Sequence, residues 1–285
     1  KTFPERPFRF WINNDQDDVE ADEPVLVQIP DHQSITIDTD RDLEDFCRLK
    51  FNSGLSLEML QRGPFRIGFK FRNVNWGNPS IRIFENQSME GSSAYLNNIP
   101  AAWNQKNRLP LPVALGGGCI IPKSFWNGRT ETTIHLIFEG ITKGEGELAV
   151  VLLNDAEEEL GYGGGSWIKL IDVREMYQRA RVENTPDEIP HPWVDANPPA
   201  QTWVWDPWDW PYSRDPDAKP VTAIQVHGWR LRYNDFMNWS DTSFKRLWHE
   251  GFRGEFYSFR WPTFSAETTG ALPYGWDETL ENTTF

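Results

Sequence analysis

Cysteine is scarce in this chain of 285 residues, occurring only at Cys47 and Cys119. Two cysteines allow at most one disulfide, so a fold held together by several disulfides is excluded, and the sequence leaves open whether these two pair. The cysteines and histidines do not cluster at zinc-ligand spacing. No apolar run is long enough to cross a membrane as a helix, so we expect no membrane span.

Basic residues are also few. The chain has 28 Lys and Arg against 42 Asp and Glu, a formal net charge of −14. An acidic surface repels a phosphate backbone, which argues against a nucleic-acid partner. The imbalance is greatest in residues 1–45, which hold 13 acidic and four basic residues.

The acidic start of the chain contains a candidate calcium site. Five closely spaced side chains offer the hard oxygen ligands that Ca²⁺ prefers: Asn13, Asp15, Asp17, Asp18 and Asp22. Their spacing does not match an EF-hand loop. The alternative is a solvated acidic loop that binds no metal.

Short apolar runs separated by turn residues dominate residues 1–182. The clearest period-two pattern covers residues 65–71, and residues 55–60 also read as a strand. Turn signals at 73–75 and 77–79 predict breaks between strands. We expect an antiparallel β-sandwich-like domain over residues 1–182, closed by a short helix at 172–182.

Tryptophan is abundant, with 15 residues. Residues 183–220 form a proline- and tryptophan-rich connector, which proline keeps from adopting regular structure. Five of its indoles are candidate interface or binding residues: Trp193, Trp203, Trp205, Trp208 and Trp210. We expect them to pack on their own domain or on another copy, with a sugar-binding platform as the alternative.

Residues 221–285 have a different pattern. A short apolar strand at 221–226 precedes a helix at 235–250, whose apolar residues form one stripe, and a strand at 256–259. This order predicts a parallel β-α-β unit. The expected fold class is therefore mixed: a β-rich domain followed by an α/β unit.

A histidine–glycine pair, His227-Gly228, follows the first of these strands, and Trp229 comes next. Together with the helix and the Phe-Arg-Trp-Pro sequence at 259–262, this region resembles the early part of lipase-like α/β-hydrolases. The resemblance implies that His227, Gly228 and Trp229 line an oxyanion hole. The alternative is an ordinary turn at a strand end.

The resemblance covers only the final fifth of the chain and is incomplete. No G-x-S-x-G nucleophile motif occurs, Ser166 does not fit that pattern, and no histidine follows residue 259. The unit is thus a truncated hydrolase-like unit without a catalytic triad. The whole chain also resembles large secreted multidomain bacterial proteins of poorly characterised function, and its start at Lys1 suggests a processed or trimmed chain.

Three functions follow from these observations. The first is a non-catalytic structural or assembly protein, secreted or at the cell surface, that self-associates or packs on a missing C-terminal remainder. The second is the N-terminal portion of a secreted serine hydrolase whose nucleophile lies beyond residue 285. The third and weakest is a carbohydrate-binding module. Apart from calcium, no cofactor is expected.

Overall fold

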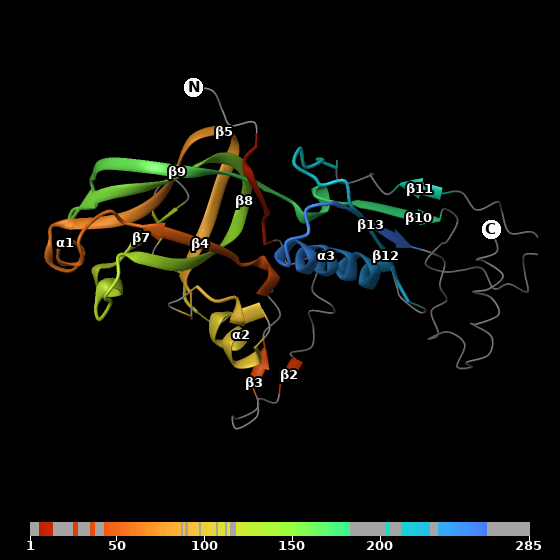
Figure 1. The fold of residues 1–285 in the computed structure, drawn as a ribbon, viewed down its shortest axis with the longest axis horizontal. Helices are drawn as coiled ribbons and strands as arrows, with labels where there is room; N and C mark the ends of the chain where they lie inside the picture. Colours follow the sequence, from red (N-terminus) through yellow and green to blue (C-terminus); the bar gives the residue numbers. More distant parts are fainter. Residues whose placement is uncertain are drawn as a thin grey trace, which may run out of the picture. The chain divides into compact units, whose positions relative to one another are not determined.

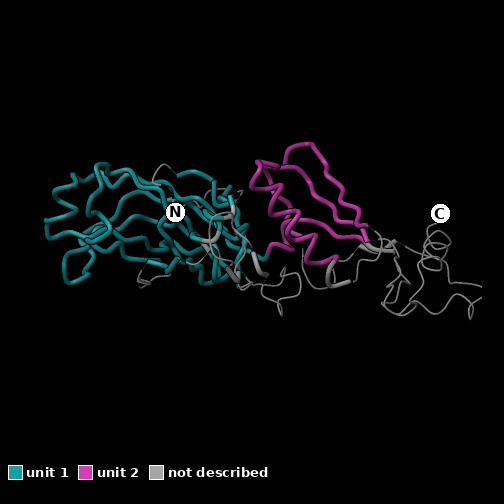
Figure 2. Tube along the Cα trace, turned by 90° about the horizontal axis from the view of Figure 1, so that it is seen from below, with its two compact units in different colours: residues 1–172 teal, residues 173–285 magenta. Residues whose placement is uncertain are grey.

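The computed structural model describes residues 6–13, 25–27, 35–37, 43–86, 88, 91–96, 98–106, 108–111, 113–114, 118–182, 203–205, 212–228 and 233–260. The chain divides into two compact units, residues 1–172 and 173–285, which Figure 2 colours separately. The strand at 178–182 belongs to the second unit, whereas the sequence pattern placed residues up to 182 in the first domain.

Unit 1 is β-rich. Its helices are α1 (Leu57–Arg62) and α2 (Ile99–Lys106), and its strands are β1 (Phe8–Trp11), β2 (Val25–Val27), β3 (Ile35–Ile37), β4 (Cys47–Asn52), β5 (Phe65–Glu85), β6 (Val113–Ala114), β7 (Gly118–Ile121), β8 (Thr133–Asn154) and β9 (Glu159–Ile171). Seven strands form one sheet in the order β1-β9-β8-β5-β7-β6, with β4 also paired to β8. Among the described strands of this sheet, β1 and β9 pair in parallel and the other pairs are antiparallel. A mostly β unit is confirmed, while its packing as a sandwich stays a prediction.

Strands β5 and β8 are long and curved, and they pair along most of their lengths (Figure 1). The sequence predicted breaks at 73–75 and 77–79, and this is wrong because β5 continues through both. Shifts in the pairing register occur there instead, with positive φ angles of 49° at Asn73 and 66° at Gly77. Asparagine and glycine tolerate this backbone conformation, so these residues bend a strand rather than end it.

Residues 57–62 form helix α1, so the predicted strand at 55–60 is also wrong. The Ser56 side chain accepts a hydrogen bond from the backbone N–H of Met59 at 3.2 Å, which caps the helix. This local cap favours a helix over the strand that the apolar residues of the segment predicted.

The core of unit 1 is aromatic. Phe10, Trp11 and Phe138 are buried, and the Phe10 and Phe138 rings meet edge to face with centroids 5.3 Å apart. A second buried cluster joins Phe46 and Phe84, whose ring centroids lie 5.3 Å apart. Edge-to-face contacts of this kind add to the stabilisation from burial.

Unit 2 contains four described strands, β10 (Gln178–Val182), β11 (Trp203–Trp205), β12 (Thr222–Val226) and β13 (Glu255–Arg260), and helix α3 (Tyr233–His249). The strand order is β11-β10-β13-β12, in which β10, β13 and β12 are parallel and β11 is antiparallel. The predicted parallel β12-α3-β13 arrangement is confirmed. The predicted helix at 172–182 is wrong, since a short 3-10 turn at Val173–Glu175 leads into β10.

Candidate functional site

The carboxyl ends of β12 and β13 meet at one edge of the parallel sheet in unit 2. His227 follows β12 there and is only 6% exposed. Its ring meets Phe236 of α3 with centroids 5.4 Å apart, and its Nδ1 lies 2.6 Å from the carbonyl oxygen of Gly228. His227 and Gly228 therefore lie at the strand end where the sequence predicted them, at the kind of edge where open α/β sheets bind ligands. Trp229 lies outside the described residues, and the oxyanion role stays a prediction.

Helix α3 covers one face of this sheet through polar contacts. The Ser240 hydroxyl lies 2.5 Å from that of Ser258 in β13, and the Gln225 amide of β12 donates to Ser243 at 3.0 Å. Ser240 and Ser258 are fully buried. Each buried hydroxyl has a partner, as burial of polar groups requires.

Asp241 of α3 is buried and holds a second set of contacts within unit 2. It accepts hydrogen bonds from the Tyr177 hydroxyl and from Nε of Arg174, the latter at 2.9 Å. Burial raises the pKa of Tyr177 well above its ordinary value, and the neighbouring Asp241 carboxylate raises it further. The sequence analysis missed Asp241, although its position three residues before Phe244 of the apolar stripe was a signal that it faces the core.

Two arginines project from the sheet face that α3 covers, and both are nearly buried. Arg179 of β10 is 5% exposed and Arg260 of β13 is 7% exposed. One guanidinium nitrogen of Arg179 lies 3.5 Å from the Met237 sulfur, and its guanidinium carbon lies 5.6 Å from the centroid of the Tyr177 ring. These two contacts of Arg179 are weak ones for a buried cation, and the sequence analysis did not predict them.

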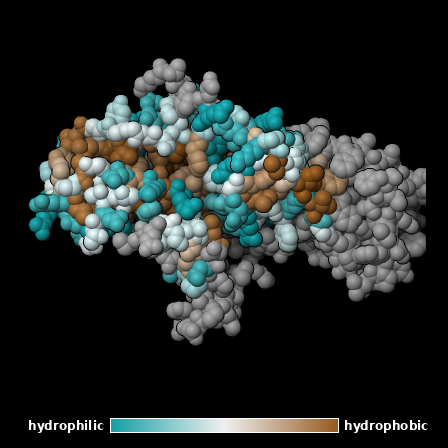
Figure 3. Space-filling model, in the orientation of Figure 1, coloured by the Kyte–Doolittle hydropathy of each residue, from teal (hydrophilic) through white to brown (hydrophobic). Residues whose placement is uncertain are grey.

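Strand β12 is the outermost described strand of the unit 2 sheet. Two of its large apolar residues are exposed, Ile224 by 67% and Val226 by 56%, and so is Val221 just before the strand, by 54%. Figure 3 shows hydrophobic residues gathered in this region of unit 2. An exposed apolar group of this kind is typical of an interaction surface.

The predicted calcium and tryptophan sites are untested. Asn13 is described, and its backbone N–H donates to Gly140 at 2.7 Å, but Asp15, Asp17, Asp18 and Asp22 lie outside the described residues. Among the described residues, no group of three or more His, Cys, Asp or Glu side chains could hold a metal ion. Trp193, Trp208 and Trp210 also lie outside these residues; Trp203 and Trp205 are described only as backbone in β11.

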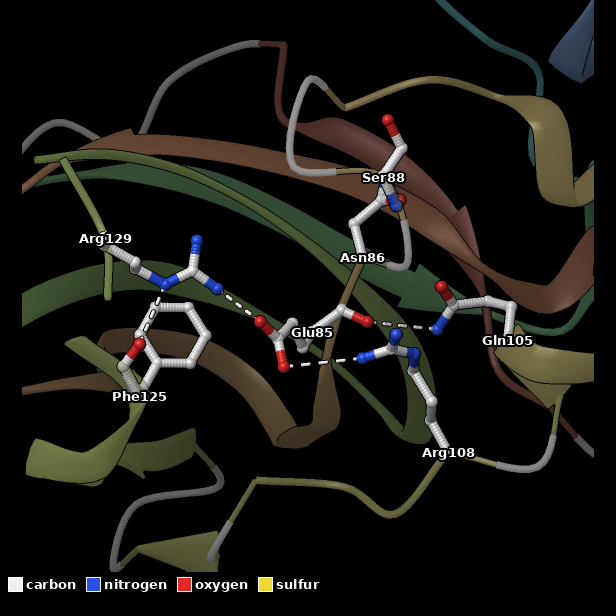
Figure 4. A network of polar contacts seen from close by, with 7 residues as sticks. All are labelled: Glu85, Asn86, Ser88, Gln105, Arg108, Phe125 and Arg129. Carbon is white, nitrogen blue, oxygen red and sulfur yellow. Dashed lines mark hydrogen bonds and ion pairs between the residues drawn. The ribbon is translucent and has the colours of Figure 1, made fainter. Parts of the chain in front are cut away.

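A polar network in unit 1 centres on Glu85, at the end of β5 (Figure 4). Its carboxylate pairs with Arg129 and, at 3.4 Å, with Arg108, while its carbonyl oxygen accepts from Gln105 at 3.2 Å. The next residue, Asn86, is 3% exposed. Asn86 belongs to a glycosylation motif, but its burial in this fold hides the acceptor nitrogen.

The two cysteines are buried in unit 1 and are not joined by a disulfide. Burial raises the pKa of the Cys119 thiol to about 12. A thiol of this kind stays protonated near neutral pH, which disfavours its reaction as a nucleophile.

Comparisons with known proteins give no match. No protein-family model matches the chain, and searches of curated proteins and of solved structures find no similar protein. In the part of the chain that the structure describes, no helix is long and apolar enough to cross a membrane.

Proposed function

We propose that this chain is a non-catalytic assembly protein, secreted or at the cell surface, in which β12 is the contact strand. The exposed, uncharged side chains of β12, which is the outermost strand of its sheet among the described residues, carry this proposal. Residues 220–228 contain no Asp, Glu, Lys or Arg. Free strand edges are usually protected by charge, proline or a bulge, and β12 itself has no charge or proline.

The face of the sheet opposite α3 adds support. Ile224 pairs in register with Tyr257 and Val226 with Phe259, so these side chains share that face. Parallel sheets are normally covered on both faces. A partner that adds a strand to β12 and covers this face completes the sheet.

The partner that fits is a second copy of this chain. Copies that each carry a net charge of −14 repel one another over most of their surfaces, and β12 is a stretch where that repulsion is absent. Antiparallel pairing of two β12 strands about a two-fold axis at Ile224 sets Thr222 of one copy opposite Val226 of the other. Such an interface is self-complementary.

Sedimentation over a range of concentrations tests this assembly. We expect the full chain to dimerise and Ile224→Lys to abolish the dimer, because a charge at the two-fold axis meets its own copy. Leu160→Lys is the matched control, since Leu160 is also an exposed strand residue, at 54%, but lies in β9 of unit 1. A wild-type chain that stays monomeric at all concentrations rules the proposal out.

A second candidate is the front portion of a serine hydrolase whose nucleophile lies beyond residue 285. The position of His227 and Gly228 after β12 favours it, since another parallel strand beside β12 would bring further residues to this edge. Intact-mass measurement of the native polypeptide, after treatment with a fluorophosphonate, tests it. A native chain that ends at Phe285 and gains no label contradicts this candidate.

A further inference from the structure

We propose that Asn127 is a self-modification site, at which the side-chain amide is lost and a succinimide ring forms with the backbone nitrogen of Gly128. Water then opens this ring to aspartate or isoaspartate. The proposal goes beyond the assembly proposed above and does not depend on it, because Asn127 lies in unit 1 and β12 in unit 2.

The reaction joins two neighbouring groups of the chain. Solvent base removes the proton of the Gly128 N–H, and the nitrogen attacks Cγ of Asn127 to form a new N–Cγ bond. The bond from Cγ to the side-chain nitrogen breaks, and this nitrogen takes up one proton and leaves as ammonia. Water then adds to one of the two ring carbonyl carbons and breaks the bond from that carbon to the ring nitrogen. Cleavage at Cγ gives aspartate, and cleavage at the main-chain carbon gives isoaspartate.

The residue after Asn127 is the first observation. The pair Asn127-Gly128 is the only asparagine–glycine pair in the sequence, and both residues are exposed. Gly128 has a φ angle of 75°, and a Cβ added there would meet no atom within 4 Å. Since glycine has no side chain, nothing crowds the ring that has to form between these two residues.

The peptide unit between the two residues is the second observation. The Asn127 N–H donates to the carbonyl of Ser124 at 3.1 Å, and the Arg129 N–H donates to that of Trp126 at 3.2 Å. Between these two bonds, the Asn127 carbonyl and the Gly128 N–H have no hydrogen-bond partner among the described residues. The ψ angle of Asn127 is 129°, so the peptide unit must rotate to bring its nitrogen beside Cγ. In the part of the chain that the structure describes, no hydrogen bond of this peptide unit opposes the rotation.

Two other asparagines show how this chain restrains the same chemistry elsewhere. The side-chain oxygen of Asn52 accepts the Gly54 N–H at 2.9 Å, which holds the side chain in place. Asn78 is followed by Pro79, whose nitrogen carries no hydrogen and cannot attack. The side chain of Asn127 makes no hydrogen bond to any described residue, so it is free to meet the Gly128 nitrogen.

The products alter a segment that is anchored on both sides. The Arg129 Nε donates to the carbonyl of Phe125 at 2.8 Å, and its guanidinium pairs with Glu85 (Figure 4). Trp126, on the other side, is 1% exposed. Isoaspartate lengthens the backbone between these anchors by a methylene, so it strains them, whereas aspartate adds only a charge.

Peptide mapping by mass spectrometry tests the proposal on the folded full chain after incubation. We expect the peptide that contains Asn127 to convert to two acidic products of equal mass. The conversion should be at least about tenfold faster at pH 9 than at pH 7, because the Gly128 nitrogen must lose its proton. Asn127→Gln should stay unconverted, since its longer side chain closes a less favourable ring. A wild-type chain in which Asn127 stays intact overturns the proposal.

The same incubation in denaturant separates the contribution of the fold from that of the asparagine–glycine pair. The rate at Asn127 in the folded chain should lie within about fivefold of the rate in denaturant, because the fold holds neither reacting group. The peptide that contains Asn52 is the internal control, and its conversion should be slower in the folded chain than in denaturant. A folded chain that converts Asn127 more slowly than this limit shows that the fold protects the site, and it overturns the proposal.

Discussion

The indole Nε1 of Trp11 donates a hydrogen bond to Oδ1 of Asp45 over 2.9 Å, joining residues 34 positions apart in the sequence. Trp11 is fully buried and Asp45 is 1% exposed. The bond therefore ties the N-terminal strand β1 to the segment before β4, where water cannot replace it. A buried carboxylate that loses a donor is costly.

The Trp11–Asp45 bond should thus contribute to the stability of unit 1. We expect Trp11→Phe to lower the free energy of unfolding by about 2–4 kcal/mol, from the lost bond and the smaller ring. Denaturant titration followed by circular dichroism measures the change. Trp239→Phe is the control, since that indole is 52% exposed, and it should leave the midpoint unchanged. Equal effects of the two substitutions contradict the assignment.

Alkaline pH should destabilise unit 2 through Tyr177. The pKa of Tyr177 is raised in the folded state, chiefly by burial, so the folded chain holds this proton more tightly than the unfolded chain. The stabilisation is fully present below the unfolded pKa of about 10 and is lost as the pH rises through the folded value.

Melting temperatures between pH 8 and pH 11 measure this effect. We expect the melting temperature of Tyr177→Phe to fall less steeply above pH 10 than that of the wild type. Tyr257→Phe is the control, because it removes the same hydroxyl group at a less buried position where the pKa is also raised. It should change the pH dependence of the melting temperature less than Tyr177→Phe does. A Tyr177→Phe slope identical to wild type contradicts the prediction.

The two cysteines should be unreactive in the native chain. Cys119 is 1% exposed with a pKa of about 12, and Cys47 is 7% exposed. Titration with a thiol reagent at pH 8 should detect no fast-reacting thiol in the folded protein and two in denaturant. A thiol count of zero in denaturant without reductant would reveal a disulfide and contradict the structure.

Glu85 should contribute more to the stability of unit 1 than its partial exposure suggests. It pairs with Arg108 and with Arg129, whose side chain is only 11% exposed. We expect Glu85→Gln to lower the free energy of unfolding by about 1–2 kcal/mol, because Arg129 loses a charged partner. Glu157→Gln removes the exposed pair with Arg66 and should have no measurable effect. The prediction is refuted if denaturant titrations show a larger loss of unfolding free energy for Glu157→Gln than for Glu85→Gln.

The sequence pattern located the elements that depend on local periodicity. It predicted the first half of β5 and the parallel β12-α3-β13 arrangement, since alternation and a helical apolar stripe are properties of neighbouring residues. It also placed His227 and Gly228 at a strand end. The pattern was wrong at 55–60, where a serine cap stabilises a helix. It was also wrong at 172–182, where pairing with β13 stabilises a strand.

The sequence by itself determined that the chain is acidic, poor in cysteine, β-rich at first and α/β afterwards. Only the tertiary structure decided that β5 runs through Asn73 and Gly77, that Asp241 meets Tyr177 across 64 residues, and that Arg179 is buried against α3. The physical reason is the range of the interactions. A strand with a bulge is stable only when its partner β8 is present, and the burial of a charge depends on which helix covers its sheet.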